Sequence, residues 1–267
     1  MSKSNAIKTF RDLLAFLTII PVGKTEDFVV TSAEHMYLFP LVGGLIGLLA
    51  AGYFLASGFI VSGTLGLANH LVTVPGDFLV NAVPAFLTIA FLLVLTGLQH
   101  FDGLIDLGNA LGLNKLEDRR AAAHAWIVTY KGAVLAFAVE FAAVSGLFLL
   151  NPDVAVQAIV SAEVAAKLAM VTILAVGKST HKGLGSYFLK KGKRRRNIIA
   201  YVIAGLVAIP LLGWIGVLIV VVGFLSGVAM GRVAASVFGG VSGDMIGATN
   251  EISRALTLVV LAGVFWV

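Results

Sequence analysis

The stretch LFPLVGGLIGLLAAGYFLAS, residues 38–57, decides the fold class of this chain. It contains no charged side chain, and about 20 mostly apolar residues are what an α-helix needs to cross the hydrocarbon core of a bilayer. Its glycines would let a neighbouring helix approach closely, as small residues do in membrane bundles. We therefore expect a membrane-spanning helix here.

The composition of the whole chain extends this prediction. Of 267 residues, 59% are apolar and 12% are charged, whereas soluble domains carry roughly 25% charged residues. The chain has no cysteine, which excludes disulfides and thiolate metal sites. The net charge of +5 reports orientation in a membrane protein, so no nucleic-acid partner is expected. We predict an all-α, polytopic helical bundle that forms a single domain, residues 1–267.

Several further segments have the length and hydropathy of membrane helices. Residues 58–72 are apolar but rich in Gly and Ser, and a short half-helix is the alternative there. Pro210 and Gly213 supply a break in a run too long for one span. The count is about seven, within a range of about six to eight. The expected spans are residues 38–57, 80–98, 133–150, 154–176, 197–212, 214–238 and 250–267.

The N-terminal segment has a different pattern. Residues 4–20 predict an amphipathic helix that ends before Pro21, with Phe10 and three leucines on the apolar side and Arg11 and Asp12 on the polar side. Such a helix is expected to lie in the membrane interface.

The distribution of Lys and Arg predicts the topology. Residues 1–37 carry four of them, residues 99–132 carry four and residues 177–196 carry eight, while the loops between these segments carry none. With seven spans, all three segments fall on one side, together with the loop 239–249. The positive-inside rule makes that side cytoplasmic, so the N-terminus and the polar loops of this cell-membrane protein are expected in the cytoplasm.

The first acidic motif is HFDGLID, residues 100–106. If the helix continues through it, Asp102 and Asp106 are one turn apart and share a face, where their repulsion calls for a cation. Carboxylates without cysteine favour a hard ion such as Mg²⁺. The alternative is a pair of solvated acids at a helix end.

The second acidic motif is FGGVSGDMIGATNE, residues 238–251. Its glycines free the backbone to approach a ligand, and exposed N–H groups in such a loop suit phosphate. The alternative is a flexible, glycine-rich loop between two spans. The candidate residues are Gly240, Gly243, Asp244, Asn250 and Glu251.

The basic segment 177–196 has two parts. Residues 190–196 predict an orientation signal that contacts anionic lipid. Lys178, His181 and Lys182 are better placed to hold an anionic substrate, although a solvated basic loop has the same composition.

Several charges lie inside expected spans, and three of them are in the third and fourth spans. Glu163 and Lys167 are spaced for an intrahelical ion pair, and Glu140 has no partner visible in the sequence. These residues either form structural ion pairs or line a substrate cavity, and the sequence does not distinguish the two.

Two acidic, glycine-rich motifs and a basic segment on one membrane face together predict a site for a metal-bound phosphate or diphosphate. At these residues the sequence resembles the cobalamin synthase family, the adenosylcobinamide-GDP ribazoletransferases. The stretches that carry the resemblance are FLTIIPV at 16–22, FPLVGGLIG at 39–47, HFDGLID at 100–106, GLG at 183–185 and GGVSGDMIGATNE at 239–251.

The resemblance implies an integral membrane enzyme of vitamin B12 biosynthesis that uses Mg²⁺. It would join α-ribazole, or its 5′-phosphate, to adenosylcobinamide-GDP, releasing GMP. The metal ligands it implies are Asp102, Asp106, Asp244 and Glu251, and the catalytic residues are His100 with the same three aspartates. The substrate-binding candidates are Arg120, Lys178, His181, Lys182, Gly240, Gly243 and Asn250.

The sequence departs from the family pattern at two positions. A third aspartate often present in the first motif is Asn109 here, and the acid of a further motif falls on Val128. An asparagine carbonyl can still bind a metal, but valine cannot.

Other classes of protein are less compatible with these motifs. CDP-alcohol phosphotransferases require D-G-x-x-A-R, whereas Asp102-Gly103 is followed here by Leu-Ile-Asp. A transporter would favour inverted repeats, and none is evident. A membrane scaffold subunit would leave both acidic motifs unexplained. A homo-oligomer is compatible with the sequence.

Overall fold

The computed structural model describes residues 3–68, 70, 76–123, 125, 127–179, 183–192 and 196–265. The regular elements in these residues are all helices, and their β pairing is limited to one isolated bridge between Ser179 and Val241. The all-α prediction is confirmed. The helices are α1 (Lys3–Leu17), α2 (Phe28–Glu34), the 3₁₀ turn η1 (Met36–Leu38), α3 (Phe39–Ala68), α4 (Gly76–Leu95), α5 (Gln99–Ala110), α6 (Leu116–Ala123), α7 (Tyr130–Leu149), α8 (Pro152–Val176), α9 (Leu184–Lys191), α10 (Ile198–Leu212), α11 (Ile215–Phe238) and α12 (Gly243–Phe265).

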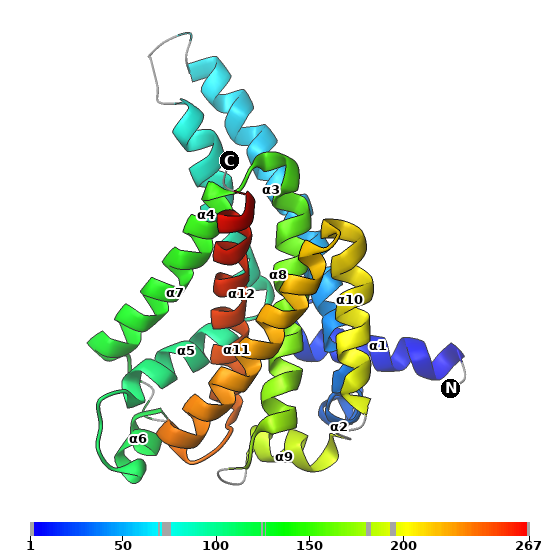
Figure 1. Cartoon of the computed structure of the whole chain (residues 1–267), viewed down its shortest axis with the longest axis vertical. Helices are drawn as coiled ribbons and strands as arrows, with labels where there is room; N and C mark the ends of the chain where they lie inside the picture. The colour runs from blue at the N-terminus through cyan, green and yellow to red at the C-terminus, as the bar shows by residue number, and fades with distance from the viewer. Residues whose placement is uncertain are drawn as a thin grey trace.

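Seven apolar helices run along the long axis of the molecule (Figure 1). Six of them, α3, α4, α7, α8, α11 and α12, are long and apolar enough to cross a membrane, and α10 is a shorter apolar helix of 15 residues. They correspond to the seven expected spans, and the break between α10 and α11 falls at Gly213, which has a positive φ of 60°. The prediction of a multi-pass membrane protein is confirmed.

Two boundaries differ from the prediction. Residues 58–68 do not form a separate half-helix, because α3 continues through them, and the end of α3 projects with α4 beyond the rest of the bundle (Figure 1). The last span begins at Gly243 rather than at residue 250. Ser242 caps it, since its hydroxyl accepts a hydrogen bond from the Met245 N–H at 3.3 Å, so only residues 239–242 link α11 to α12.

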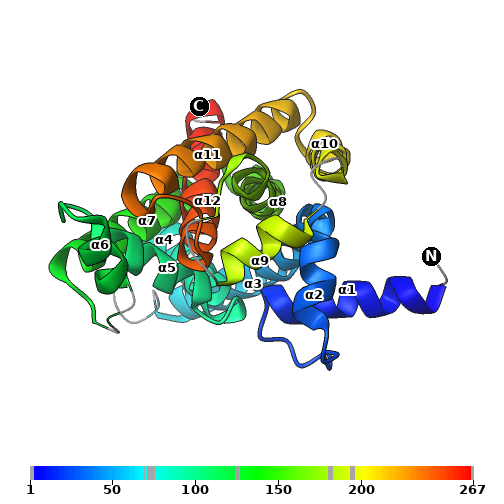
Figure 2. The ribbon, with the colours of Figure 1, turned by 90° about the horizontal axis from the view of Figure 1, so that it is seen from below.

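Helix α8 is the centre of the bundle and is surrounded by α3, α10, α11 and α12 (Figure 2). Glycines on two of these neighbouring helices allow the close contact. A Cβ at Gly47 of α3 would lie 2.6 Å from the Val160 Cα, and a Cβ at Gly227 of α11 would lie 2.7 Å from the Ala169 carbonyl oxygen. Close approach through small residues is the usual way in which membrane helices pack.

Helix α1 crosses the bundle at a steep angle to the long helices (Figure 1). It confirms the predicted N-terminal amphipathic helix, with Leu13 and Leu17 buried. Asp12 does not belong to a wet face as expected: it is fully buried and accepts hydrogen bonds from the Thr25 N–H and hydroxyl at 3.0 and 2.8 Å. Asp12 therefore fixes the segment that leads from α1 to α2.

The helix that carries the first acidic motif is separate from the span before it. Gly97 and Leu98 have positive φ values of 68° and 59°, which end α4 and turn the chain. Helix α5 then runs across the lower part of the bundle, between α12 and α7 (Figure 1). HFDGLID is thus a short helix of its own and not the end of a span.

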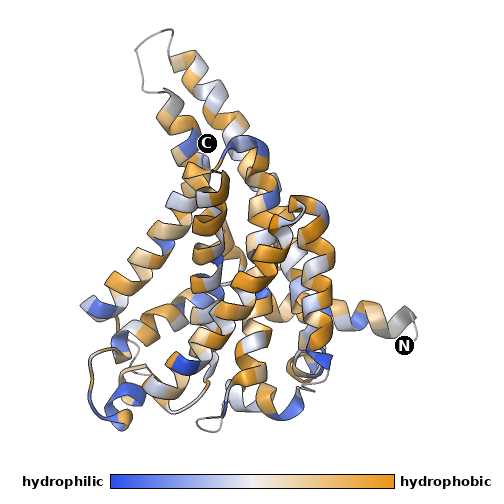
Figure 3. Ribbon diagram, viewed as in Figure 1, coloured by the Kyte–Doolittle hydropathy of each residue, from blue (hydrophilic) through white to orange (hydrophobic). Residues whose placement is uncertain are grey.

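The segments rich in charge gather at one end of the molecule. Figure 3 shows hydrophilic residues concentrated there, around α6 and the end of α9, while the turns α7–α8 and α10–α11 lie at the opposite end. The predicted partition of the basic segments to one side therefore agrees with the fold.

Candidate functional site

Three aspartates from two helices line one cavity at the charge-rich end. Asp102 and Asp106 lie one turn apart on α5, and Asp244 lies in the first turn of α12. The cavity that they share has a volume of about 260 Å³, and we call it the acid cavity. The structure thus brings the two acidic motifs together at these residues. The acid cavity is also lined by Ile105, Ala123, Ile127 and Val128.

The glycine between the first two acids explains how the helices come so close. A Cβ at Gly103 would lie 2.4 Å from the carbonyl oxygen of Asp244, so a larger residue would push α5 away from the start of α12. On the other helix, a Cβ at Gly247 would lie 3.0 Å from the His100 Cα. Glycine at both positions lets the two backbones pack directly against each other.

The electrostatics of the acid cavity favour a bound cation. Burial, followed by the charges of Asp244 and Asp102, raises the pKa of Asp106 to about 7. No basic side chain lines this cavity among the residues that the structure describes. A cation would remove the repulsion and keep all three carboxylates ionised.

The positions of the carboxylates suit a metal ion that takes only some of its ligands from the protein. In the described part of the chain no three acidic or histidine side chains are grouped tightly enough to hold a metal by themselves. Mg²⁺ characteristically takes one or two carboxylates and completes its shell with water and substrate phosphate oxygens. Asp102, Asp106 and Asp244 fit that chemistry.

The two positions where a further acid was expected have different surroundings. Asn109 is buried, its Oδ1 accepts hydrogen bonds from the Thr129 N–H at 3.0 Å and hydroxyl at 2.7 Å, and its Nδ2 donates to the Ile127 carbonyl at 2.8 Å. Asn109 therefore holds the segment before α7. Val128 lines the acid cavity but offers no ligand.

A second cavity, of about 380 Å³, adjoins the first and shares Asp102 and Asp244 with it. We call it the aromatic cavity, because Phe16 of α1, Phe39 of α3 and Phe188 of α9 line one side. The predicted substrate residue Gly243 also lines it. Sequence reasoning did not identify the three phenylalanines, although the motifs FLTIIPV and FPLVGGLIG contain the first two of them.

His100 lies at the wall of the aromatic cavity. Burial, followed by the positive charges of Lys167 and Arg254, holds the pKa of its imidazole well below the ordinary value. Its Nδ1 has no hydrogen-bond partner among the described residues and lies 3.7 Å from the Glu251 Oε1. His100 is therefore held in its neutral form.

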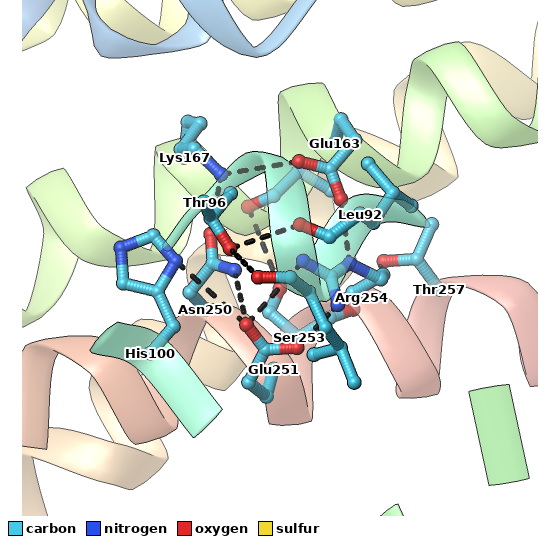
Figure 4. A network of polar contacts seen from close by, with 12 residues as sticks. Leu92, Thr96, His100, Glu163, Lys167, Asn250, Glu251, Ser253, Arg254 and Thr257 are labelled. Atoms are coloured by element: carbon cyan, nitrogen blue, oxygen red, sulfur yellow. Dashed lines mark hydrogen bonds and ion pairs between the residues drawn. The ribbon is translucent and has the colours of Figure 1, made fainter. Parts of the chain in front are cut away.

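Deeper in the bundle, five side chains of α8 and α12 form what we call the buried ion network (Figure 4). Lys167 donates to Glu163 at 3.1 Å and to the Asn250 Oδ1 at 2.7 Å, which confirms the predicted Glu163–Lys167 pair and extends it. Arg254 donates to Glu163 at 2.6 Å and pairs with Glu251. This network connects α8 to α12 inside the membrane domain.

The network contains two residues that were predicted at the site. Glu251 and Asn250 are buried in the middle of α12, not at a helix start, and Asn250 donates to Glu251 at 3.0 Å. Glu251 is two helical turns from Asp244, or about 10 Å along the axis, and lines neither cavity. The structure thus does not bring Glu251 and Asn250 together with the three aspartates.

The predicted basic residues also lie apart from the aspartates. Arg120 donates to the Phe238 carbonyl at 2.9 Å, at the C-terminal end of α11, where a cation is favoured. Lys178 is exposed, and its carbonyl accepts a hydrogen bond from the Val241 N–H at 2.8 Å. Neither residue lines a cavity described above. His181 and Lys182 lie outside the described residues.

Gly240, the other glycine predicted to approach a ligand, is buried in the link before α12. Its φ of 158° is close to extended backbone, and it does not line either cavity. Of the two glycines named from the sequence, Gly243 alone lies where a ligand in a described cavity would touch it.

The chain is similar to known proteins over almost its whole length. Residues 9–262 match the family described as cobalamin-5-phosphate synthase. Among similar proteins, the adenosylcobinamide-GDP ribazoletransferase of Methanocella arvoryzae is 32% identical over 98% of both chains, and that of Methanosarcina barkeri is 30% identical over 95% of this chain and 91% of its own. No solved structure matches the chain significantly. Because the match extends over almost the whole chain, the chain belongs to the cobalamin-5-phosphate synthase family.

Proposed function

We propose that this protein joins a riboside, α-ribazole or its 5′-phosphate, to adenosylcobinamide-GDP and releases GMP. The observation that carries the proposal is the meeting of Asp102, Asp106 and Asp244 at one cavity, next to a second cavity that contains a neutral His100. The substrates come from the name of the relatives, adenosylcobinamide-GDP ribazoletransferase.

The reaction forms one bond to phosphorus and breaks another. A ribose hydroxyl oxygen attacks the phosphorus next to the cobinamide, and the bond from that phosphorus to the bridging oxygen breaks, so that GMP leaves with the bridging oxygen. The family description, cobalamin-5-phosphate synthase, implies a product that keeps a phosphate on the 5′ oxygen. The attacking oxygen is therefore a secondary hydroxyl of the ribose.

The residues have separate tasks in this proposal. His100, which is neutral and lines the aromatic cavity together with Asp102, accepts the proton of the attacking hydroxyl. Asp102, Asp106 and Asp244 would hold Mg²⁺, which when bound supplies positive charge against the diphosphate. Positioning and charge neutralisation are what phosphoryl transfer chiefly requires.

Purified protein in liposomes tests the proposal. With adenosylcobinamide-GDP, α-ribazole and Mg²⁺ we expect release of GMP in equal amount to the corrinoid product, and no release after chelation of divalent ions by EDTA. Absence of GMP release with every divalent ion tried would overturn the enzymatic assignment. Full activity in EDTA would overturn the metal assignment alone.

We also propose that the end carrying the acid cavity faces the cytoplasm, because the basic segments lie there. The chain has no cysteine, so His70→Cys, between α3 and α4, introduces a single thiol at the opposite end. An impermeant maleimide should label it from outside intact cells. Labelling only after the cells are opened would reverse the orientation.

A further inference from the structure

The aromatic cavity has a role that the aspartates do not explain. Its three phenylalanine rings contact one another, with centroids 5.1 Å apart for Phe16–Phe188 and 6.1 Å apart for Phe16–Phe39. Phe39 and Phe188 are almost completely buried, at 0% and 1% exposure. Three helices distant in the sequence thus supply one rigid aromatic wall, which Met170 and Leu174 of α8 extend.

The polar groups of the cavity are confined to one part of its lining. They come from α5, which supplies Gln99, His100 and Asp102, and from the start of α12, with Ser242 and Asp244. No lysine or arginine lines the cavity among the residues described in the structure. The cavity therefore suits a ligand with one flat, apolar part and one hydroxylated part.

We infer that the aromatic cavity binds the riboside acceptor, with its base against Phe16, Phe39 and Phe188 and its ribose toward Asp102 and Asp244. The inference rests on the proposed function and assigns one of its two substrates to a place. Because Asp102 and Asp244 also line the acid cavity, a ribose in this orientation lies where a diphosphate in the acid cavity can be attacked. Each substrate then has its own cavity, and the reaction takes place at their shared wall.

The size and chemistry of the cavity distinguish the acceptor from the parts of the donor. Its volume of about 380 Å³ lies in the range of small-ligand sites, roughly 300–1,000 Å³, and is far too small for a corrinoid macrocycle with its amide side chains. Guanine has several polar edge groups, which would be buried against Phe39, Phe188 and Leu174 without partners. A benzimidazole-like base with few polar atoms avoids that penalty.

Filling or reshaping the cavity tests the inference without touching the acids. Leu184→Trp adds bulk at a half-exposed position on its rim, and Leu206→Trp, on the exposed surface of α10, is the matched control. Phe188→Leu keeps an apolar side chain but removes a ring, and Phe137→Leu, on the exposed surface of α7, is its control. Because stacking of a base on an aromatic ring contributes to binding, loss of a ring should weaken binding about tenfold.

The measurements are the Kd of α-ribazole alone, by calorimetry on protein in lipid nanodiscs, the KM of each substrate and the inhibition constant of GMP. We expect Leu184→Trp and Phe188→Leu to raise the Kd and KM for α-ribazole about tenfold or more. The KM for adenosylcobinamide-GDP, the inhibition by GMP and both control variants should stay near wild type. That combination supports the inference.

Three other results would overturn it. If the variants raise the KM of the donor or weaken GMP while α-ribazole is unaffected, the cavity belongs to the guanosine and the proposed function still stands. If α-ribazole binding and turnover are normal in both variants, the cavity holds neither substrate. If the wild type neither binds α-ribazole nor releases GMP, the proposed function itself fails, and the inference fails with it.

Discussion

The acid cavity and the buried ion network both bring carboxylates together but differ in how those charges are balanced. In the network, Glu163 and Glu251 are both bonded to Arg254, and Lys167 is bonded to Glu163 and Asn250. In the acid cavity three carboxylates face one space with no basic residue in the described lining. Acids bonded to basic side chains hold helices together, whereas acids that converge on one cavity are placed where an external cation and its ligand could bind.

Neutralising an acid of the cavity should have the largest effect. We expect Asp102→Asn and Asp244→Asn each to reduce kcat by about 10³-fold or more, because each removes a charged group at the reacting phosphate, while thermal unfolding stays near wild type. Asp153→Asn, at the exposed start of α8 on the opposite end, is the control. GMP release by the purified variants is the measurement. Normal turnover of both cavity variants would show that the acid cavity has no role in the reaction.

Breaking the network should affect stability instead. Arg254→Met leaves Glu251 buried without its cation and Glu163 with Lys167 alone, and loss of one partner of a buried ion pair destabilises a protein by about 3–5 kcal/mol. We expect a clearly lower unfolding temperature in detergent. Arg232→Met, at an exposed position of α11, should unfold like the wild type. An Arg254→Met protein with unchanged thermal unfolding but no activity would indicate that the network acts in catalysis.

A change at the contact between α5 and α12 should reveal how strictly the acids must be positioned. Gly103→Ala places a methyl group 2.4 Å from the Asp244 carbonyl oxygen, so α5 must shift. A displacement of about 1 Å at a reacting centre can reduce the rate about 10²-fold. We expect that loss in kcat, with Gly52→Ala, where a Cβ meets nothing within 4 Å, as the control. Equal activity of the two variants would contradict the close-contact argument.

The smallest effect is expected at Asn109. In Asn109→Asp the donor to the Ile127 carbonyl is replaced by a carboxylate oxygen, and a buried hydrogen bond lost in this way destabilises by about 1–3 kcal/mol. We expect a modest fall in unfolding temperature and no change in the Mg²⁺ concentration for half-maximal activity. Val128→Asp is the matched variant, because its acid would enter the acid cavity and should lower that concentration. Stronger metal dependence in Asn109→Asp would show that its side chain reaches the cavity.

The sequence predicted most of the fold but only part of the site. Hydropathy located all seven apolar helices, because about 20 apolar residues with few charges are required to cross a bilayer wherever they pack. It misplaced the start of α12, because glycines at 239–247 indicate a loop when they are read locally. In the structure Gly247 lies in the helix, against α5, so tertiary packing outweighs the low helix propensity of glycine.

For the candidate site, too, the sequence predicted some features and missed others. Asp102 and Asp106 share a helix face, and their spacing was sufficient to predict it. Glu251 belongs to the same motif as Asp244 and was therefore expected at the site, but the folded α12 carries it two turns away and into contact with Arg254. Phe188 gave no signal at all, since a lone aromatic residue in a basic segment has no pattern to identify it.

By itself the sequence determined that the chain is a multi-pass helical membrane protein, which helices it forms and that its polar chemistry lies at one end, because hydropathy, charge and helical period are properties of neighbouring residues. The tertiary structure alone decided which acids are bonded to basic side chains and which converge on a cavity. Glu163 is neutralised by Arg254, 91 residues away in the sequence, whereas Asp106 lies close to the charges of Asp244, on α12, and of Asp102, on its own helix. Compensation of a buried charge depends on which side chains surround it, and only the packing of the helices brings those side chains together.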